Sequence, residues 1–404
     1  MLTPQQTWSV ITAHIARLPT CALPLDQAIG HVLAEPVYAD RDLPPANRSA
    51  MDGFAVRADD LAHLPVTLPV AGEVAAGSPA TPEVARGTCV RIFTGGNLPP
   101  GADTVVIIET TREADPGEVT FTATERSGAN ILLQGENAKQ GSVLVPAGRT
   151  LGPVHLGVCA AAGRTQVRVF GKPRVAIITT GRELLDPGAV AGAHQERDAN
   201  GPLLAATLMA NGFVVASSTR VSDEREAIIE QLRSALNRAD AVVLSGGVSV
   251  GAFDFVPTAV TSVGARVLVH GVAMKPGKPF LFALAPGGRP IFGLPGNPLS
   301  AATTLHEFVL PALRLAAGWS GEESRPLVRA RLREAIPNKP GRQRFALATL
   351  AWSADGPEVA PEPSQSSADL AAGARADGTI IVPSDASGLD AGELVDFRPW
   401  RSWP

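Results

Sequence analysis

The feature that most limits the possible folds is a regular alternation of apolar runs and helical patterns that begins at Lys172. In chain order, the predicted elements are strands in RVAIITT, FVVASSTRV, AVVLSGG and RPIFGLPG, and helices over 200–211, over 223–238 and from Pro298. Strands that alternate with helices favour a mainly parallel sheet covered by helices on both faces. We therefore predict a doubly wound α/β domain, which is the centre of the molecule.

The segments on either side of this domain follow different patterns. Thr3 before Pro4 predicts the start of a helix, and a second helical pattern runs through Leu25 and Leu33 until Pro36. Short β-type runs between glycine turns follow, and alternating runs near the C-terminus fit a small β barrel or sandwich. We predict four parts: a helical N-terminal part of residues 1–39 with 138–171, an inserted β-rich module over 40–137, the α/β domain over 172–320, and a C-terminal β-barrel domain over 321–404.

Charge and cysteine usage limit the partners and the compartment. The net charge is −4 and the pI is about 6.0, so a site for an anionic ligand must be built locally and nucleic acid is disfavoured. The three cysteines form no C-x-x-C pair, which favours a reducing compartment. The start lacks a signal-peptide pattern, and no apolar run approaches the roughly 20 residues that cross a bilayer. We expect a cytoplasmic protein that binds no membrane.

Three glycine-rich turns follow strands of the predicted α/β sheet. Such turns can present backbone N–H groups to a phosphate or another oxyanion at the carboxyl ends of the strands. No Walker A lysine and no G-x-G-x-x-G accompany them, which argues against a kinase or a Rossmann dehydrogenase. Each turn alone also fits a simple tight connection, whereas three together favour a binding site. The turns are Thr179–Glu183, Ser245–Gly251 and Pro295–Pro298.

Carboxylates accompany the turns: Glu183, Asp254 and Asp223. They would repel an anionic ligand unless a divalent cation lay between, and Mg²⁺ on one or two carboxylates and phosphate oxygens is the usual solution. We therefore predict a metal held by these three residues. Asp223 with Glu226 also matches a capping box, and Asn200 before Gly201-Pro202 also matches an N-cap, so both residues keep a structural alternative.

Lys275 and Lys278 lie three residues apart around a Pro-Gly turn in MKPGKP. Two ammonium groups on a rigid turn suit a phosphate or a small tetrahedral oxyanion, although an exposed basic hairpin tip is the alternative. The seven histidines show no H-x-x-x-H or H-E-x-x-H spacing, and no G-x-S-x-G is present. A His-ligated zinc hydrolase and an α/β-hydrolase are both unsupported.

The segments TTGREL, RDANGPLL, SGGVSVGAFD, MKPGKP and GLPGNPLS, in this order, resemble the molybdopterin-binding domain of the bacterial molybdopterin molybdenumtransferases and of the C-terminal domain of gephyrin. NRSAMDGFAV, RIFTGGNLPPGADTVV, GSVLVPAGRTLGP and PGRQRF are also similar to that family, so the resemblance covers nearly the whole chain. SGG-type turns alone occur in related adenylyltransferases and in nicotinamide-nucleotide deamidases. The combination is therefore the specific signal.

The resemblance implies an elongated homodimer whose helical part supplies dimer contacts and whose cleft is lined by two subunits. It implies a transferase of molybdenum-cofactor biosynthesis, with adenylylated molybdopterin and molybdate as substrates and Mg²⁺ as the required cation. AMP would be released, and molybdenum would remain on the dithiolene sulfurs. The implied protein partners are an adenylyltransferase and molybdoenzymes.

The resemblance also assigns site residues. Asp52 and Thr94 look like contributions of the β module to the partner's cleft, although Asp52-Gly53 also fits a turn and Thr94 a loop. The expected catalytic residues are Asp52, Thr94, Glu183, Asp223 and Asp254. The expected substrate-binding residues are Thr180, Gly181, Asn200, Ser245, Gly246, Gly247, Ser249, Lys275, Lys278, Pro295, Gly296, Asn297, Pro298, Ser300, Arg342 and Ser367.

Three positions depart from the family pattern. Asn137 stands where relatives often have aspartate, Gly271 where some have a further lysine, and SSADLAAGARADG replaces a more serine-rich stretch. These changes put an acidic contact, part of the oxyanion affinity and any serine contact beyond Ser367 in doubt. A molybdopterin adenylyltransferase and a non-catalytic cofactor-binding scaffold are the alternative functions, and the sequence does not distinguish molybdenum from tungsten.

Overall fold

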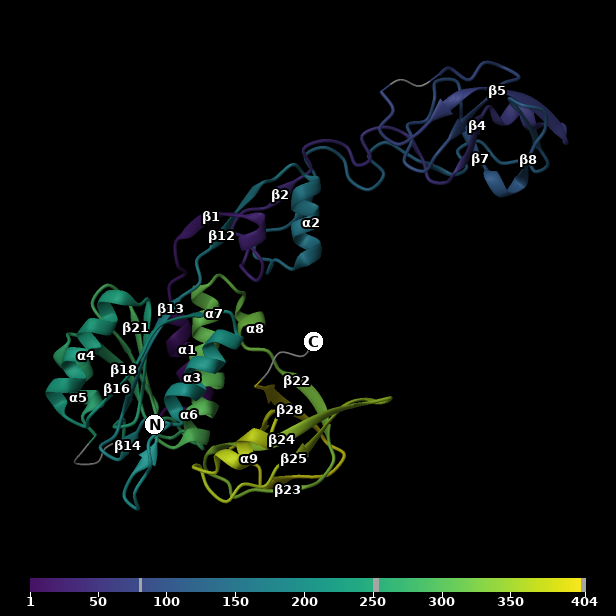
Figure 1. The fold of residues 1–404 in the computed structure, drawn as a ribbon. Helices are drawn as coiled ribbons and strands as arrows, with labels where there is room; N and C mark the ends of the chain where they lie inside the picture. Colours follow the sequence, from purple (N-terminus) through teal and green to yellow (C-terminus); the bar gives the residue numbers. More distant parts are fainter. Residues whose placement is uncertain (80–81, 250–253, 401–404) are drawn as a thin grey trace.

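The computed structural model describes residues 1–79, 82–249 and 254–400. Figure 1 shows an elongated molecule, with a β-rich module at one end and an α/β domain beside a β barrel at the other. None of the helices in the described part of the chain combines the length and apolar character that a membrane crossing requires.

The α/β domain is built on a six-stranded sheet of order β16-β13-β17-β21-β20-β18. β13 pairs in parallel with β16 and β17, β17 pairs in parallel with β21, and β20 runs antiparallel to both of its neighbours. The predicted doubly wound, mainly parallel sheet is thus confirmed. The strands are β13 (Arg174–Thr180), β16 (Val214–Val221), β17 (Ala241–Ser245), β18 (Arg266–His270), β20 (Leu281–Leu284) and β21 (Pro290–Leu294).

Helices cover both faces of this sheet because successive strand residues face opposite cores. One core contains α3 (Asn200–Ala210) and a long helical segment over 298–316, and the other contains α4 (Arg225–Arg238) and α5 (Val256–Ser262). The segment, called the 298–316 helix below, consists of α6 (Pro298–Thr304), a π-helical turn (Leu305–Val309) and α7 (Leu310–Ala316).

The N-terminal part divides between two neighbours. α1 (Pro4–His14) begins at a capping box of Thr3 and Gln6, and its Trp8 and Ile11 pack in the core of the α/β domain. β1 (Thr20–Pro24) instead pairs antiparallel with β12 (Gln166–Phe170), next to α2 (Pro153–Ala161). We propose that the chain divides into the four domains that the sequence predicts.

The second predicted helix was wrong. Only Leu25–Gln27 is helical, as a 3₁₀ turn, and Gly30 has a φ of +70°, which ends any helix there. The apolar spacing that suggested a helix instead places Ala28 and Leu33 in a small core with Cys159. Apolar residues at helical spacing can therefore also face a core from a segment without regular secondary structure.

Antiparallel ladders connect the N-terminal part to the β module. β2 (Val37–Tyr38) pairs with β11 (Val143–Val145), and β3 (Arg48–Ser49) pairs with β10 (Ile131–Leu132). The chain thus leaves and returns along the same path (Figure 1). The module is a sheet of order β7-β4-β6-β5-β9-β8, with β4 (Gly53–Val56), β5 (Val66–Val74), β6 (Cys89–Ile92), β7 (Thr104–Ile107), β8 (Thr111–Glu113) and β9 (Glu118–Phe121).

The C-terminal strands close into a five-stranded barrel, since β24 pairs with both β25 and β26. This confirms the barrel and excludes the sandwich. One further strand, β19 (Met274–Lys275), extends from the α/β domain and pairs with β24. The barrel strands are β22 (Val328–Leu332), β24 (Gln343–Ser353), β25 (Gly356–Pro361), β26 (Gly378–Val382) and β28 (Leu394–Pro399).

Candidate functional site

A cleft of about 1300 Å³ lies between the carboxyl ends of the parallel strands and the barrel. The α/β domain lines it with the three glycine-containing turns and MKPGKP, and the barrel lines it with 334–337, 342, 344–347 and 361–368. Of the expected substrate-binding residues, Gly181 and Ser249 do not line the cleft, and the others do. Val250 and Gly251 of the second turn lie outside the described residues.

Polar contacts fix the first turn at the end of β13. The hydroxyl of Thr179 donates to Asp198 Oδ2 at 2.7 Å, and the hydroxyl of Thr180 donates to Asp223 Oδ1. Asp198 also accepts from the backbone N–H of Gly201 and thereby caps α3. Asp198 lies in the connection before α3, and Asp223 lies in the connection before α4. The first turn is therefore tied to both of these connections.

The alternative capping roles are not observed. α4 begins after Glu224 without a side-chain cap, so Asp223 faces the cleft rather than capping α4. Asn200 is the first residue of α3, and its amide donates to Ser245 Oγ at 2.9 Å and to the carbonyl oxygen of Gly296 at 2.7 Å. Asn200 thereby joins the second turn to the third.

The second turn requires glycine. Gly246 has a φ of +99°, and a Cβ on it would collide with the carbonyl oxygen of Thr180. The neighbouring Ser245 is buried and donates its hydroxyl to the carbonyl oxygen of Pro295 at 3.1 Å. The backbones of the three turns consequently lie close enough to bind one ligand.

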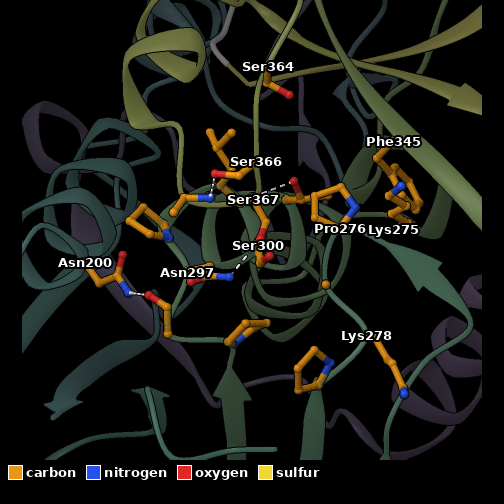
Figure 2. Close-up of a pocket in the computed structure, with 18 of the residues that line it drawn as sticks. Asn200, Lys275, Pro276, Lys278, Asn297, Ser300, Phe345, Ser364, Ser366 and Ser367 are labelled. Atoms are coloured by element: carbon orange, nitrogen blue, oxygen red, sulfur yellow. Dashed lines mark hydrogen bonds between the residues drawn. The ribbon is translucent and has the colours of Figure 1, made fainter.

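Basic and hydroxyl side chains gather where the α/β domain meets the barrel. Figure 2 shows Lys275 and Lys278 on one side of Ser300, with the side chain of Lys278 pointing away from it, and Ser364, Ser366 and Ser367 on the barrel side. Asn297 Nδ2 donates to Ser367 Oγ at 2.7 Å, and Arg342 lines the same cleft. These groups suit a tetrahedral oxyanion, because cations and hydroxyl groups line one cleft.

Acidic side chains also line the cleft. Glu183, Asp223 and Asp254 all contribute to its wall. Among the described residues, however, no three His, Cys, Asp or Glu side chains are grouped closely enough to hold a metal ion. The donor set fits a Mg²⁺ that takes one or two carboxylates and completes its shell with ligand phosphates and water. It does not fit a metal enclosed by protein ligands alone.

Asp52 and Thr94 lie together, but outside this cleft. Asp52 Oδ1 accepts from the backbone N–H and from the hydroxyl of Thr94, each at 2.7 Å, and these bonds lower the pKa of the Asp52 carboxyl. Both residues belong to the β module at the far end of the molecule (Figure 1). Within one chain they do not line the cleft.

Several cleft residues were not predicted. Asp198 stands in RDANGP and Arg344 in PGRQRF, and both motifs had been singled out without these residues. Ser364 and Ser366 belong to the loop at the start of the SSADLAAGARADG stretch, where the sequence put any serine contact beyond Ser367 in doubt. This loop is ordered by Asp369, whose carboxylate accepts from the N–H groups of Gln365 and Ala372 and has a lowered pKa as a result.

Comparisons with known proteins agree along the chain. Three family models match: "MoeA N-terminal region (domain I and II)" over residues 2–163, "Probable molybdopterin binding domain" over 176–315, and "MoeA C-terminal region (domain IV)" over 329–400.

Curated relatives and solved structures match over nearly the full length. A molybdopterin molybdenumtransferase of Staphylococcus aureus is 34% identical over 94% of this chain and 91% of its own, and one of Staphylococcus epidermidis is 34% identical over 92% and 89%. A crystal structure of the molybdopterin biosynthesis MoeA protein from Pyrococcus horikoshii matches with a TM-score of 0.83 and 30% identity, and covers 100% of both chains.

Proposed function

Because the chain belongs to the molybdopterin molybdenumtransferase family, a family of transferases that insert molybdenum in molybdenum-cofactor biosynthesis, we propose a specific reaction for its cleft. The substrates are adenylylated molybdopterin and molybdate. The phosphoanhydride is hydrolysed, AMP leaves, and molybdenum remains on the dithiolene sulfurs.

The observation that supports this reaction best is the composition of the cleft. Lys275, Lys278 and Arg342 share one cleft with Glu183 and Asp223. A dianion and a phosphoanhydride need separate counter-charges, which the lysines and a cation on the carboxylates can provide. A cleft that binds a single monoanion would need neither the paired lysines nor a cation on the carboxylates.

Each group of residues has a proposed role. The glycine turns, with Gly246 and Gly247, present backbone donors to the phosphates. Lys275 and Lys278 hold the oxyanion against Ser300. The bond between Asn297 and Ser367 joins the third turn to the barrel wall of the cleft. When Mg²⁺ is bound by Asp223 with Glu183 or Asp254, it supplies positive charge to the anhydride oxygens.

We further propose a cytoplasmic homodimer in which Asp52 and Thr94 of one subunit complete the partner's cleft. In support, the pair belongs to the β module, which lies at the far end of an elongated molecule, where a twofold partner could bring it to a second cleft. The cysteines Cys21, Cys89 and Cys159 are unpaired, which fits a reducing compartment. Docking of an adenylyltransferase or a molybdoenzyme would then occur at the assembled cleft.

The direct test uses the purified full-length protein with adenylylated molybdopterin, molybdate and Mg²⁺. Release of AMP that depends on molybdate and stops with a chelator supports the reaction. Adenylate transfer from ATP to molybdopterin would identify an adenylyltransferase instead, and delivery of cofactor without AMP release would identify a scaffold.

The shared cleft is tested by mixing two inactive variants, D52N and K275A/K278A. Random reassociation makes half of the dimers mixed, and each mixed dimer has one cleft without a substitution, so roughly a quarter of wild-type activity should return. Light scattering reports the dimer independently. No recovery from subunits that do exchange would contradict the shared cleft.

A further inference from the structure

A buried cluster of charges lies on the 298–316 helix, away from its cleft end. Glu307 belongs to the π-helical turn and is 0% exposed. Its carboxylate contacts two arginines that come from outside the α/β domain core. Arg325 belongs to the connection that leads into the barrel, and Arg398 belongs to β28, a strand of the barrel.

The geometry of this cluster is tight. Arg398 Nε donates to Glu307 Oε1 at 2.8 Å, and Arg325 Nη2 donates to Glu307 Oε2 at 2.7 Å. Arg398 also donates from Nη1 to the carbonyl oxygen of Arg325 at 2.8 Å and to that of Pro326. One guanidinium therefore joins the barrel, the connection and the helix at a single point.

Glu307 is the carboxylate on which the charge balance depends. In the part of the chain that the structure describes, Arg325 and Arg398 both form their ion pairs with Glu307. The adjacent His306 is buried, stacks on Trp400 with ring centroids 5.3 Å apart, and has a pKa lowered to about 3 by burial and by Arg314 and Arg398. His306 is therefore neutral near pH 7 and adds no charge to the cluster. Apolar side chains would suffice for simple packing, whereas a paired charge selects one arrangement of its partners.

The cleft end of the same helix has its own contacts with the barrel. The backbone N–H of Leu299 donates to the carbonyl oxygen of Ser367 at 3.1 Å, and Asn297 Nδ2 donates to Ser367 Oγ. Leu299 also packs with Leu347 and Ala372 of the barrel. Polar contacts thus attach the helix to the barrel at two points, one at the cleft and one at Glu307. The packing of Phe345 in the helix's core and the pairing of β19 with β24 lie beside them.

The bonds at Glu307 limit how far the barrel can shift along and away from the helix. If they are lost, the polar bonds at Leu299 and Asn297 carry the load at the cleft end and open more often, so the wall that contains Ser367 and Arg342 shifts relative to Ser300. Displacements of about 1 Å in a substrate-positioning wall are enough to reduce rates strongly.

We propose that Glu307, through Arg398, is a positioning residue for the cleft: it fixes the barrel wall at the distance from the 298–316 helix that the oxyanion requires. This inference rests on the proposed function, because the oxyanion is molybdate there. Glu307 does not line the cleft and touches no substrate.

The test compares E307Q and R398Q with V359A. E307Q removes the negative charge at constant shape, and R398Q removes the barrel's contact while it leaves the neutral Glu307–Arg325 pair. Val359 is 0% exposed in the barrel core and does not line the cleft, so V359A destabilises the barrel without changing its attachment. The steady-state parameters for molybdate are measured at a temperature where all variants are folded.

We expect the KM for molybdate to rise about tenfold in E307Q and R398Q, with kcat falling less than about threefold, because the acids and glycine turns stay in place. E307D should restore KM to within about threefold of wild type, since it keeps the charge. Amide exchange at Leu299, followed by mass spectrometry with residue-level fragmentation, should become faster in E307Q and R398Q but not in V359A.

The outcomes separate the two proposals. If wild type releases no AMP, the proposed function fails, and faster exchange at Leu299 in R398Q alone still supports the positioning role. If wild type is active and R398Q leaves both KM and Leu299 exchange unchanged, the positioning role is overturned. An equal rise in KM for V359A would also overturn it, because loss of barrel stability would then explain the effect.

Discussion

The two ends of the 298–316 helix use charged and polar groups in opposite ways. At the cleft end, Lys275, Lys278 and Arg342 line open space, and hydrogen bonds such as those of Asn200, Ser245 and Asn297 shape the turns beside them. At the far end, Glu307 and Arg398 are buried and bonded to each other. Charges left open to a cleft await a ligand, whereas charges that satisfy each other in the interior define an arrangement of the chain.

The largest effect that we expect from this contrast is on the free energy of unfolding. E307Q should lower the free energy of unfolding by about 3–5 kcal/mol, because two buried guanidinium groups lose their counter-charge. The matched control D396N breaks the exposed Arg329–Asp396 pair, which lies at 3.3 Å in the same barrel as Arg398, and should cost about 0–1 kcal/mol. Denaturant titration of both variants measures the difference, and equal losses would break the contrast.

The cleft end should behave in the reverse manner. K275A/K278A should lower kcat/KM for molybdate about a hundredfold, since the oxyanion loses its charge-assisted bonds, while the free energy of unfolding changes by less than about 0.5 kcal/mol. Initial rates measure the change in kcat/KM, and denaturant titration measures the change in the free energy of unfolding. A stability loss as large as that of E307Q would mean that the lysines serve the fold.

The buried end should also make stability depend on pH. The folded pKa of His306 is lowered to about 3 from its ordinary value of 6.5, so the unfolded chain binds the proton first. His306 therefore costs no stability above pH 6.5, and stability falls as the pH drops from there toward 3, by up to about 1.4 kcal/mol per pH unit. H306Q should flatten this slope when unfolding is followed across the range. An unchanged slope would assign it to other groups.

The smallest expected effect concerns the β module. The pKa of Asp52 lies below its ordinary value of 3.8 because Thr94 donates two hydrogen bonds, so any stability from this pair is present above that pH and is lost as the pH falls through the folded pKa. T94V removes the hydroxyl bond and should shift the Asp52 pKa upward, which carboxyl chemical shifts in an NMR titration would report. T88V, on a threonine whose hydroxyl donates to the Ala85 carbonyl, is the control and should leave the Asp52 pKa unchanged.

Much of the α/β domain could be predicted because its local signals agree. Apolar runs, turn glycines and helix starts all indicate the same elements, and Gly246 must be glycine for the reason that the sequence suggests. The prediction of a helix through Leu33 failed because core spacing alone does not require a helix, and Gly30 breaks it.

The remaining features depend on contacts between distant residues. Asn200 matched an N-cap, but its amide is taken by Ser245 and Gly296, which lie far along the chain. The Glu307 cluster could not be predicted, since Arg398 is 91 positions away and no spacing rule links them. Likewise, the serines of the barrel loop reach the cleft only because the barrel closes beside it.

The packing of α1 has a consequence for how the protein is made. Ile11 shares its core with Leu313, which is synthesised about 300 residues later. At roughly 5–20 residues per second on the ribosome, α1 waits on the order of 15–60 seconds for the surface that covers it. During that interval its apolar stripe, with Trp8 and Ile11, is exposed, while the β module has already left the ribosome and can fold. The apolar face of α1 is therefore open to wrong contacts until the 298–316 helix has been made.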